Sequence, residues 1–263
     1  MVAKQLIQKY NVPGPRYTSY PTVPFWKKDQ LNSEEWLTEL DSAFHNFPNA
    51  SIGIYIHLPF CESLCTFCGC HKRITKNHEV ETPYIDSVLK EWQLYKKHLP
   101  KDIRISELHF GGGTPTFFHP SELIRLLKGI FQMDQIDPQV CDLSFEAHPN
   151  STSELHLQTL YDFGFRRVSF GIQDYNPKVQ KAIHRMQTFE EIQEVHAHSK
   201  RIGYVSINHD LIYGLPYQSL AGFEQTIDYT IQLHPERIAL YGYAHVPWIK
   251  GTGQRGYNEQ DLP

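Results

Sequence analysis

The sequence predicts an α/β protein built around a parallel sheet, and the order of its segments is the reason. Six short apolar runs with strand character recur along the chain, at residues 52–58, 105–110, 141–146, 167–171, 205–212 and 237–243. Segments with helical spacing of apolar residues separate them, at residues 80–99, 120–131, 151–163, 188–202 and 219–233. Strands that alternate with helices in this way form parallel sheets. The pattern alone does not separate a doubly wound sheet from a barrel.

An extended arm is predicted ahead of the first strand. The run Gly-Pro-Arg-Tyr-Thr-Ser-Tyr-Pro at residues 14–21 is incompatible with a regular helix, so residues 1–31 are expected to be extended. The tyrosines of this run argue against disorder, because disordered segments are poor in aromatic residues.

The starts of several helices are marked by their side chains. A Ser, Thr or Asn followed three residues later by Glu is the spacing of a capping box, in which each side chain accepts a hydrogen bond from the other residue's backbone. One such pair predicts an additional helix over residues 32–47, and two others mark helices already named. The pairs are Asn32 and Glu35, Ser151 and Glu154, and Thr188 and Glu191.

Four of the five cysteines fall within ten residues, directly after the first predicted strand. Cys61, Cys65 and Cys68 have the spacing C-x3-C-x2-C, and Cys70 follows as C-x-C. Thiolates gathered this closely need a soft metal to neutralise their charge. Three thiolates on one loop suit three corners of a cubic iron–sulfur cluster and leave the fourth iron for an outside ligand.

Three other interpretations of the cysteines are disfavoured, and coincidental core cysteines fit least because Glu62, Ser63 and Thr66 make this segment a loop. A disulfide framework is disfavoured because the count is odd and no signal peptide opens the chain. Structural zinc could be held by Cys65, Cys68 and Cys70, but zinc ribbons use a second, distant Cys-x2-Cys pair, which this sequence lacks. Iron–sulfur is the interpretation that we adopt, with Cys141 as a buried apolar residue of the third strand.

Polar or glycine-rich residues follow every predicted strand. In parallel α/β folds the chemistry gathers at the carboxyl ends of the strands, where loops from different strands converge. The sequence therefore predicts a site at this edge of the sheet. In chain order these residues are the cysteine loop, Gly111 to Pro115, Glu146 with His148, Gln173 with Asp174, Asp210, and Ala244 with His245.

The cysteine loop after a strand, with Phe67 just before its last ligand, resembles that of the radical S-adenosylmethionine (SAM) superfamily. The Tyr-Ile-His-Leu-Pro-Phe-Cys run at residues 55–61, the additional Cys70 and the run at residues 14–21 resemble one branch, the oxygen-independent coproporphyrinogen III oxidases. The resemblance extends from about residue 10 to the last residue. It implies a partial (β/α)6 barrel of the TIM type.

The resemblance also implies a domain organisation. Residues 1–50 would form the arm and its helix, residues 51–250 the barrel, and residues 251–263 the start of a C-terminal region. Members of the family continue into a largely helical domain at this point. This chain would therefore correspond to a shortened form or a fragment of such an enzyme.

By the same resemblance the cofactors are a [4Fe–4S] cluster, with Cys61, Cys65 and Cys68 as ligands, and two molecules of SAM. Cys70 and Arg16 are accessory candidates, Arg16 because a guanidinium grips carboxylates in two-pronged fashion. Residues matched to the first SAM are Tyr55, Phe67, Gly112 and Glu146. Residues matched to the second SAM are Gly113, Thr114, Gln173, Arg185, Asp210 and Ala244.

Three residues depart from the family pattern. His148 stands in Glu-Ala-His-Pro where the family usually has Glu-Val-Asp-Pro. His184 and His209 stand where Asn and Ile are more common. The matched site residues are retained.

The implied reaction is oxidative decarboxylation of two propionates of coproporphyrinogen III to vinyl groups, giving protoporphyrinogen IX for haem synthesis. A 5′-deoxyadenosyl radical takes a hydrogen atom from each propionate, and carbon dioxide and an electron then leave. The implied partners are the tetrapyrrole and a reductant such as flavodoxin or ferredoxin, and the expected state is a cytoplasmic monomer. A net charge of −4 argues against nucleic-acid binding, and no apolar run is long enough to span a membrane.

Rival functions stay open. A related haem chaperone generally lacks the fourth cysteine and the N-terminal arm, both of which are present here. A haem-degrading methyltransferase branch shares the cysteine loop. An inactive cluster-binding fragment and a structural zinc protein complete the alternatives.

Overall fold

The computed structural model describes residues 4–10, 22, 25–26, 32–47, 49–131, 140–246 and 254–263. The chain divides into two compact units, Met1–Asn46 and Phe47–Pro263.

The described part of the first unit includes the α-helices α1 (Lys4–Tyr10) and α2 (Ser33–Asn46). The capping box of α2 is confirmed: Asn32 Oδ1 accepts from the Glu35 N–H at 2.8 Å, and Glu35 Oε2 accepts from the Asn32 N–H at 3.1 Å. Helix α1 corrects the expectation that residues 1–31 are extended throughout, because it lies ahead of the first proline. Arg16 and the rest of its run, residues 14–21, lie outside the described residues.

The second unit contains a six-stranded sheet in which all neighbours are parallel and follow the order β1-β4-β5-β6-β7-β8. Its described strand pairs end at β1 and β8, so the sheet is open at both edges. The predicted parallel α/β architecture is confirmed, with each strand within two residues of its predicted ends. The strands are β1 (Ser51–Leu58), β4 (Arg104–Gly112), β5 (Asp142–Ala147), β6 (Arg167–Gln173), β7 (Ser206–Tyr213) and β8 (Arg237–Gly242).

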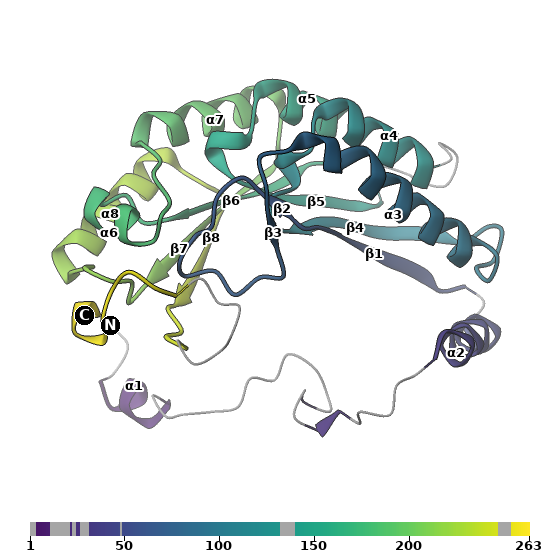
Figure 1. Ribbon diagram of the computed structural model, residues 1–263, viewed down its shortest axis with the longest axis horizontal. Coiled ribbons are helices and arrows are strands. Elements are labelled where there is room, and N and C mark those ends of the chain that lie inside the picture. The colour runs from purple at the N-terminus through teal and green to yellow at the C-terminus, as the bar shows by residue number, and fades with distance from the viewer. Residues whose placement is uncertain are drawn as a thin grey trace. The chain divides into compact units, whose positions relative to one another are not determined.

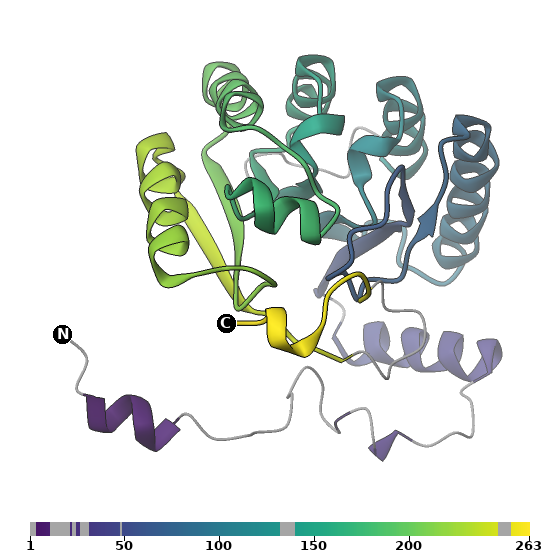
Figure 2. The same cartoon turned by 60° about the vertical axis from the view of Figure 1, so that its left-hand side comes forward.

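Five long helices cover one face of this sheet, side by side in chain order (Figures 1 and 2). They are α3 (Glu81–Lys96), α4 (Pro120–Ile130), α5 (Glu154–Asp162), α7 (Phe189–Ile202) and α8 (Leu220–Leu233), and the short α6 (Pro177–Ala182) precedes α7. None of the described helices combines the length and hydropathy needed to cross a bilayer.

Two details of the helices differ from the prediction. The cap of α5 is Ser153 paired with His156, not Ser151 paired with Glu154, because Ser151 still belongs to a 3-10 turn, Pro149–Ser151. Helix α6 was not predicted, since its six residues are too short for a periodic signal. The capping box of Thr188 and Glu191 at α7 is confirmed.

The two faces of the sheet differ sharply in chemistry. Successive side chains of a strand point to opposite faces, and the alternate residues that face the helices include the fully buried Phe110, Phe145 and Phe170. The residues between them are half-buried and polar, as at Glu146 and Ser169, which are register partners on β5 and β6. The sheet therefore seals an apolar core on one side and presents polar groups on the other.

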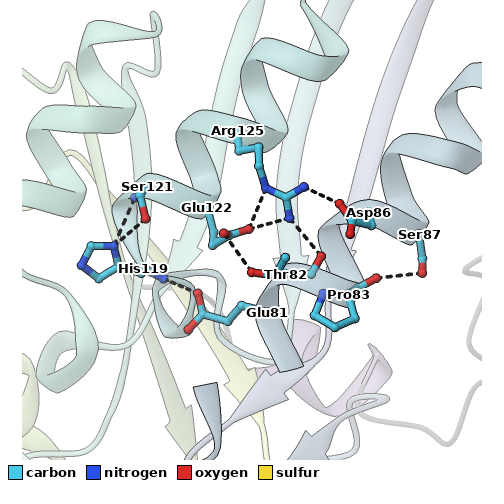
Figure 3. Close-up of polar contacts among 9 residues, drawn as sticks. All are labelled: Glu81, Thr82, Pro83, Asp86, Ser87, His119, Ser121, Glu122 and Arg125. Atoms are coloured by element: carbon cyan, nitrogen blue, oxygen red, sulfur yellow. Dashed lines mark hydrogen bonds and ion pairs between the residues drawn. The ribbon is translucent and has the colours of Figure 1, made fainter. Parts of the chain in front are cut away.

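Polar contacts join α3 to α4 near the start of each helix (Figure 3). Arg125 of α4 donates to Asp86 Oδ1 at 2.5 Å and to the Thr82 carbonyl at 2.9 Å. The buried carboxylate of Glu81 accepts from the His119 N–H at 2.7 Å. These bonds fix the loop that leads from β4 into α4.

A pair of buried histidines lies between the sheet and α7. His196 Nδ1 and His209 Nε2 are 3.1 Å apart, and the side chains are 5% and 0% exposed. Burial is the main reason that the pKa of His196 is lowered to about 4 and that of His209 to about 3. Lys200 lowers the pKa of both further, and each is opposed in part by Glu236.

We predict that this pair makes the fold acid-sensitive. Histidines of the unfolded chain titrate near pH 6.5, so below that pH the unfolded state binds more protons than the folded state. The free energy of unfolding should fall by about 2 kcal/mol per histidine between pH 7 and pH 5. Denaturant melts at both pH values measure this. His209→Ile should reduce the pH dependence, and an unchanged dependence would contradict the prediction.

Candidate cofactor site

A cavity of about 450 Å³ lies at the carboxyl ends of the strands. The cysteine loop forms part of its wall, and most of the remainder comes from residues at or just beyond the ends of β4 to β8. The segment between α6 and α7 contributes His184, Arg185 and Met186. Most of the sequence-predicted site residues line it. They are Cys61, Cys65, Phe67, Cys68, Cys70, Gly112, Gly113, Thr114, Glu146, Gln173, Arg185 and Asp210.

Two described candidates, Tyr55 and Ala244, do not line this cavity, and a third candidate is not among the described residues. The Tyr55 ring stacks on His109 with centroids 5.9 Å apart, and its hydroxyl lies 3.0 Å from His57 Nδ1. Ala244 follows β8, and its carbonyl accepts from the Gln254 side chain at 2.6 Å. Arg16 lies outside the described residues. The roles of all the candidate residues, these three included, stay predictions.

The glycine run at the end of β4 is needed for close backbone approach. Gly112 has φ +116°, and a Cβ there would lie 2.8 Å from the His57 ring. A Cβ on Gly113 would lie 2.6 Å from the Pro59 carbonyl. The Gly113 N–H donates to the Leu58 carbonyl at 2.9 Å. Glycine thus lets the end of β4 run directly against the entry to the cysteine loop.

Two very short strands close the cysteine loop at its base. β2 (Phe60–Cys61) pairs in parallel with β3 (Arg73–Ile74), and the Thr75 N–H donates to the Cys61 carbonyl at 2.9 Å. These strands were not predicted, because two residues carry no periodicity. They bring both ends of the loop to one place beside the cavity.

Hydrogen bonds within the cysteine loop and to the end of α6 hold the loop in place. Lys72 Nζ donates to the Cys68 carbonyl at 3.0 Å and to the Cys70 carbonyl at 3.2 Å. Thr66 is fully buried, and its hydroxyl and N–H donate to the Ala182 and Ile183 carbonyls at 2.9 and 3.0 Å. The end of α6 therefore anchors the middle of the cysteine loop.

The thiols differ in their tendency to ionise. A hydrogen bond from the Cys70 thiol is the main reason that the pKa of Cys68 is lowered to about 6. The same bond raises the pKa of Cys70. Burial raises the pKa of Cys61, whose sulfur lies 3.3 Å from the Thr114 hydroxyl. Cys68 is thus suited to bind metal as a thiolate, whereas Cys70 keeps its proton and acts as a donor.

Arg185 brings a positive charge to the loop. Its Nη1 donates to Cys65 Sγ at 3.6 Å, and its Nε donates to the Gly171 carbonyl at 3.1 Å. The neighbouring His184 and, at the end of β6, Gln173 have left-handed backbone with φ +53° and +71°. Non-glycine residues rarely adopt this conformation, and residues that do so often lie at functional sites.

A ladder of buried amide groups supports the segment that carries Arg185. Gln187 Nε2 donates to the Ile172 carbonyl at 2.5 Å, and Gln180 Nε2 donates to the Gln187 carbonyl at 2.8 Å. Gln180 and Gln187 are 2% and 3% exposed. Because buried amide groups are costly to leave unpaired, this ladder holds the segment in one place against the end of β6.

Two carboxylates face the same cavity. Glu146 Oε2 accepts from the Gly112 N–H at 3.1 Å. Asp210 accepts from the Ser169 hydroxyl at 2.9 Å and from Asn208 Nδ2 at 2.7 Å. Burial is the main cause of a raised pKa at Asp210. Glu146 on β5 and Asp210 on β7 are therefore hydrogen-bond acceptors on the two strands that flank β6.

The residues present fit an iron–sulfur cluster. Four thiols on one loop border a cavity, Cys68 among them has a lowered pKa, and a guanidinium lies against Cys65. Within the described residues, no three His, Cys, Asp or Glu side chains are arranged around one point as a single metal ion requires. Three thiolates can each bind a different iron of a cluster, which does not require them to surround one point.

Sequence reasoning missed four residues that shape this site: Lys72, Thr66, Ser169 and Asn208. Strand alternation could have indicated Ser169 and Asn208, because they share a sheet face with Glu146 and Asp210. No sequence signal marks Thr66, whose partners lie about 116 residues away along the chain. Lys72 has the appearance of an ordinary exposed lysine until its carbonyl partners are seen.

Comparisons with known proteins agree with this geometry. A family model described as the radical SAM superfamily matches residues 55–230. Proteins called oxygen-independent coproporphyrinogen III oxidase are similar over nearly the whole chain. The one from Helicobacter pylori strain J99 is 42% identical over 97% of this chain and 55% of its own length, and that from Escherichia coli K12 is 37% identical over 98% and 55%.

A solved structure of coproporphyrinogen III oxidase from Escherichia coli, described as a radical SAM enzyme, superimposes with a TM-score of 0.88 and 34% identity. The match covers 98% of this chain and 56% of that one. The predicted barrel class is therefore confirmed. The chain spans about half the length of the relatives that it matches.

We predict that Cys61→Ala, Cys65→Ala and Cys68→Ala each prevent cluster formation, because each removes one of three thiolate ligands. Cys70→Ala should retain the cluster, since this thiol acts as a donor to Cys68. Iron and sulfide content and visible absorbance after anaerobic reconstitution measure both effects. A Cys70→Ala protein without a cluster would show that the ligand set is wrong.

We also predict that Thr66→Val loosens the cysteine loop. Valine has nearly the same shape but leaves the part-buried Ala182 carbonyl without the Thr66 hydroxyl as donor, at a cost of about 1 kcal/mol. The free energy of unfolding of the cluster-free protein and the rate at which a chelator removes iron are the measurements. Thr66→Ser keeps the hydroxyl and is the matched control. Equal behaviour of the two variants would argue against the anchor.

Proposed function

The chain belongs to the radical SAM superfamily, and we propose that it acts in the anaerobic oxidation of coproporphyrinogen III. Two propionate side chains become vinyl groups, and protoporphyrinogen IX is formed. One observation carries the proposal: a chain similar along nearly its whole length to oxidases of this name gathers its cysteine loop and five strand ends around one cavity.

The chemistry defines what the site must provide. Each propionate loses carbon dioxide, one hydrogen atom and one electron, and the two remaining carbons form the vinyl double bond. A [4Fe–4S] cluster and SAM are the cofactors of this family, and together they supply a carbon radical that accepts the hydrogen atom. The protein contributes binding, orientation and the exclusion of water and oxygen.

We assign Cys61, Cys65 and Cys68 to the cluster. The outside ligand of the cluster would be SAM, with Gly112 and Glu146 beside its amino group. Glu146 Oε2 accepts one backbone N–H and Oε1 lies 3.7 Å from His109 Nε2, and the lone pairs that these contacts do not use could accept from an ammonium group. Tyr55 and Phe67 complete this first SAM site in the proposal.

A second SAM would lie farther along the cavity. Asp210 is oriented by Ser169 and Asn208 and is suited to accept from ligand hydroxyls. The Arg185 guanidinium and backbone groups at the ends of the neighbouring strands would bind the rest of the second SAM. The residues proposed for it are Gly113, Thr114, Gln173, Arg185, Asp210 and Ala244.

The setting of the reaction is part of the same proposal. A reductant such as flavodoxin or ferredoxin would deliver the electron that starts each cycle, and the compartment would be the cytoplasm, where cysteines stay reduced. The protein would act as a monomer. Residues 1–50 would serve as the arm and helix, residues 51–250 as the barrel, and residues 251–263 as the start of a C-terminal region.

The test is SAM cleavage by the anaerobically reconstituted chain. With a chemical reductant, 5′-deoxyadenosine should form, and its rate should rise when coproporphyrinogen III is added. Cys65→Ala is the control that should form none. A rate of SAM cleavage that does not change when coproporphyrinogen III is added would contradict the proposed substrate. A cluster-loaded chain that does not cleave SAM would contradict the proposed activity of this chain.

A further inference from the structure

His148 lines the cavity directly beyond the end of β5, yet no role has been assigned to it above. Its Nδ1 accepts from the Asn150 N–H at 3.2 Å and caps the 3-10 turn Pro149–Ser151. A capping position of this kind is ordinarily filled by Asp, Asn, Ser or Thr, which offer an oxygen acceptor. Histidine performs the same capping and has a second ring nitrogen to spare.

The cap determines the tautomer of the ring. Because Nδ1 accepts a hydrogen bond, it carries no proton, and the proton of the neutral imidazole must reside on Nε2. Burial, with the nearby Arg185 charge as the second cause, lowers the pKa of His148 to about 2. The ring therefore stays neutral at working pH and offers the cavity one N–H donor.

Arg185 lies on the segment that faces this turn. Asn150 Nδ2 donates to the Met186 carbonyl at 3.0 Å, which ties the two segments together. A guanidinium has five N–H groups, and the contacts to Gly171 and Cys65 use one on each of its three nitrogens. Two N–H groups of Arg185 consequently remain for a ligand.

We propose that His148 and Arg185 form one subsite that binds a carboxylate of the ligand. The guanidinium supplies the charge and the geometry that carboxylates prefer. The imidazole adds a neutral donor that does not repel the guanidinium. The Asp typical of the family at this position would instead place a negative charge beside Arg185, where it would repel a ligand carboxylate. The subsite rests on the proposed function, because that function determines which carboxylates reach the cavity.

Two ligands of the proposed reaction carry such a group: the amino-acid end of SAM and the propionates of the tetrapyrrole. The experiment separates them with two ligand pairs that differ in the carboxylate. One pair is S-adenosylhomocysteine and 5′-methylthioadenosine, and the other is coproporphyrin III and its tetramethyl ester. Dissociation constants are measured on the cluster-loaded chain by calorimetry or fluorescence, without turnover.

The variants are His148→Asp and His148→Asn. Both side chains cap a turn well, so thermal stability should match the wild type. Asp removes the N–H donor and places a negative charge beside Arg185. The dissociation constant of the carboxylate-bearing ligand of one pair should therefore rise by about tenfold or more. Asn keeps an N–H donor and should stay within about threefold of the wild type. The carboxylate-free member of each pair should be unaffected.

Each outcome decides the matter. If His148→Asp loses affinity for S-adenosylhomocysteine but not for 5′-methylthioadenosine, the subsite binds the carboxylate of SAM. If it loses affinity for coproporphyrin III but not for the tetramethyl ester, the subsite binds a propionate. Unchanged affinities in His148→Asp, or equal losses for both members of a pair, overturn the subsite and leave the proposed function intact. A wild-type chain that binds none of the four ligands contradicts both.

Discussion

The structure depends on one constraint, the parallel alignment of six strands whose one face is sealed by helices. Since side chains alternate along a strand, burying phenylalanines such as Phe110 and Phe145 against the helices forces Glu146 and its equivalents onto the other face. Parallel register then places polar groups of successive strands beside one another, as with Ser169 opposite Asn208. The cavity is the consequence of this arrangement at the end where all six strands terminate.

The cysteine loop has little regular structure of its own and is held by contacts with the rest of the sheet. Gly113 connects it to the end of β4, Thr66 to the end of α6, and Arg185 to the end of β6. Thiolates close together repel one another, and the positive charges of Lys72 and Arg185 reduce that repulsion. The loop is therefore arranged for its cofactor by residues far from it in sequence.

Much of this could be predicted, for reasons that the particular elements make clear. Long periodic segments such as β7 and α7 gave the right type and nearly the right ends, since burial of one face imposes the period. The short elements α6, β2 and β3 were not predicted, because they have too few residues to show a period. The start of α5 was misplaced because Ser151 and Ser153 both precede it, and only the 3-10 turn decides between them.

The sequence by itself determined the alternating architecture, the cysteine spacing and the polar residues at each strand end, because these are properties of neighbouring residues. Tertiary structure decided which of them meet. It placed Arg185 against Cys65 and gave His148 a fixed tautomer, and it left Ala244 away from the cavity wall. Such contacts depend on strand register and loop path, which result from packing of the whole sheet and which no local pattern of residues encodes.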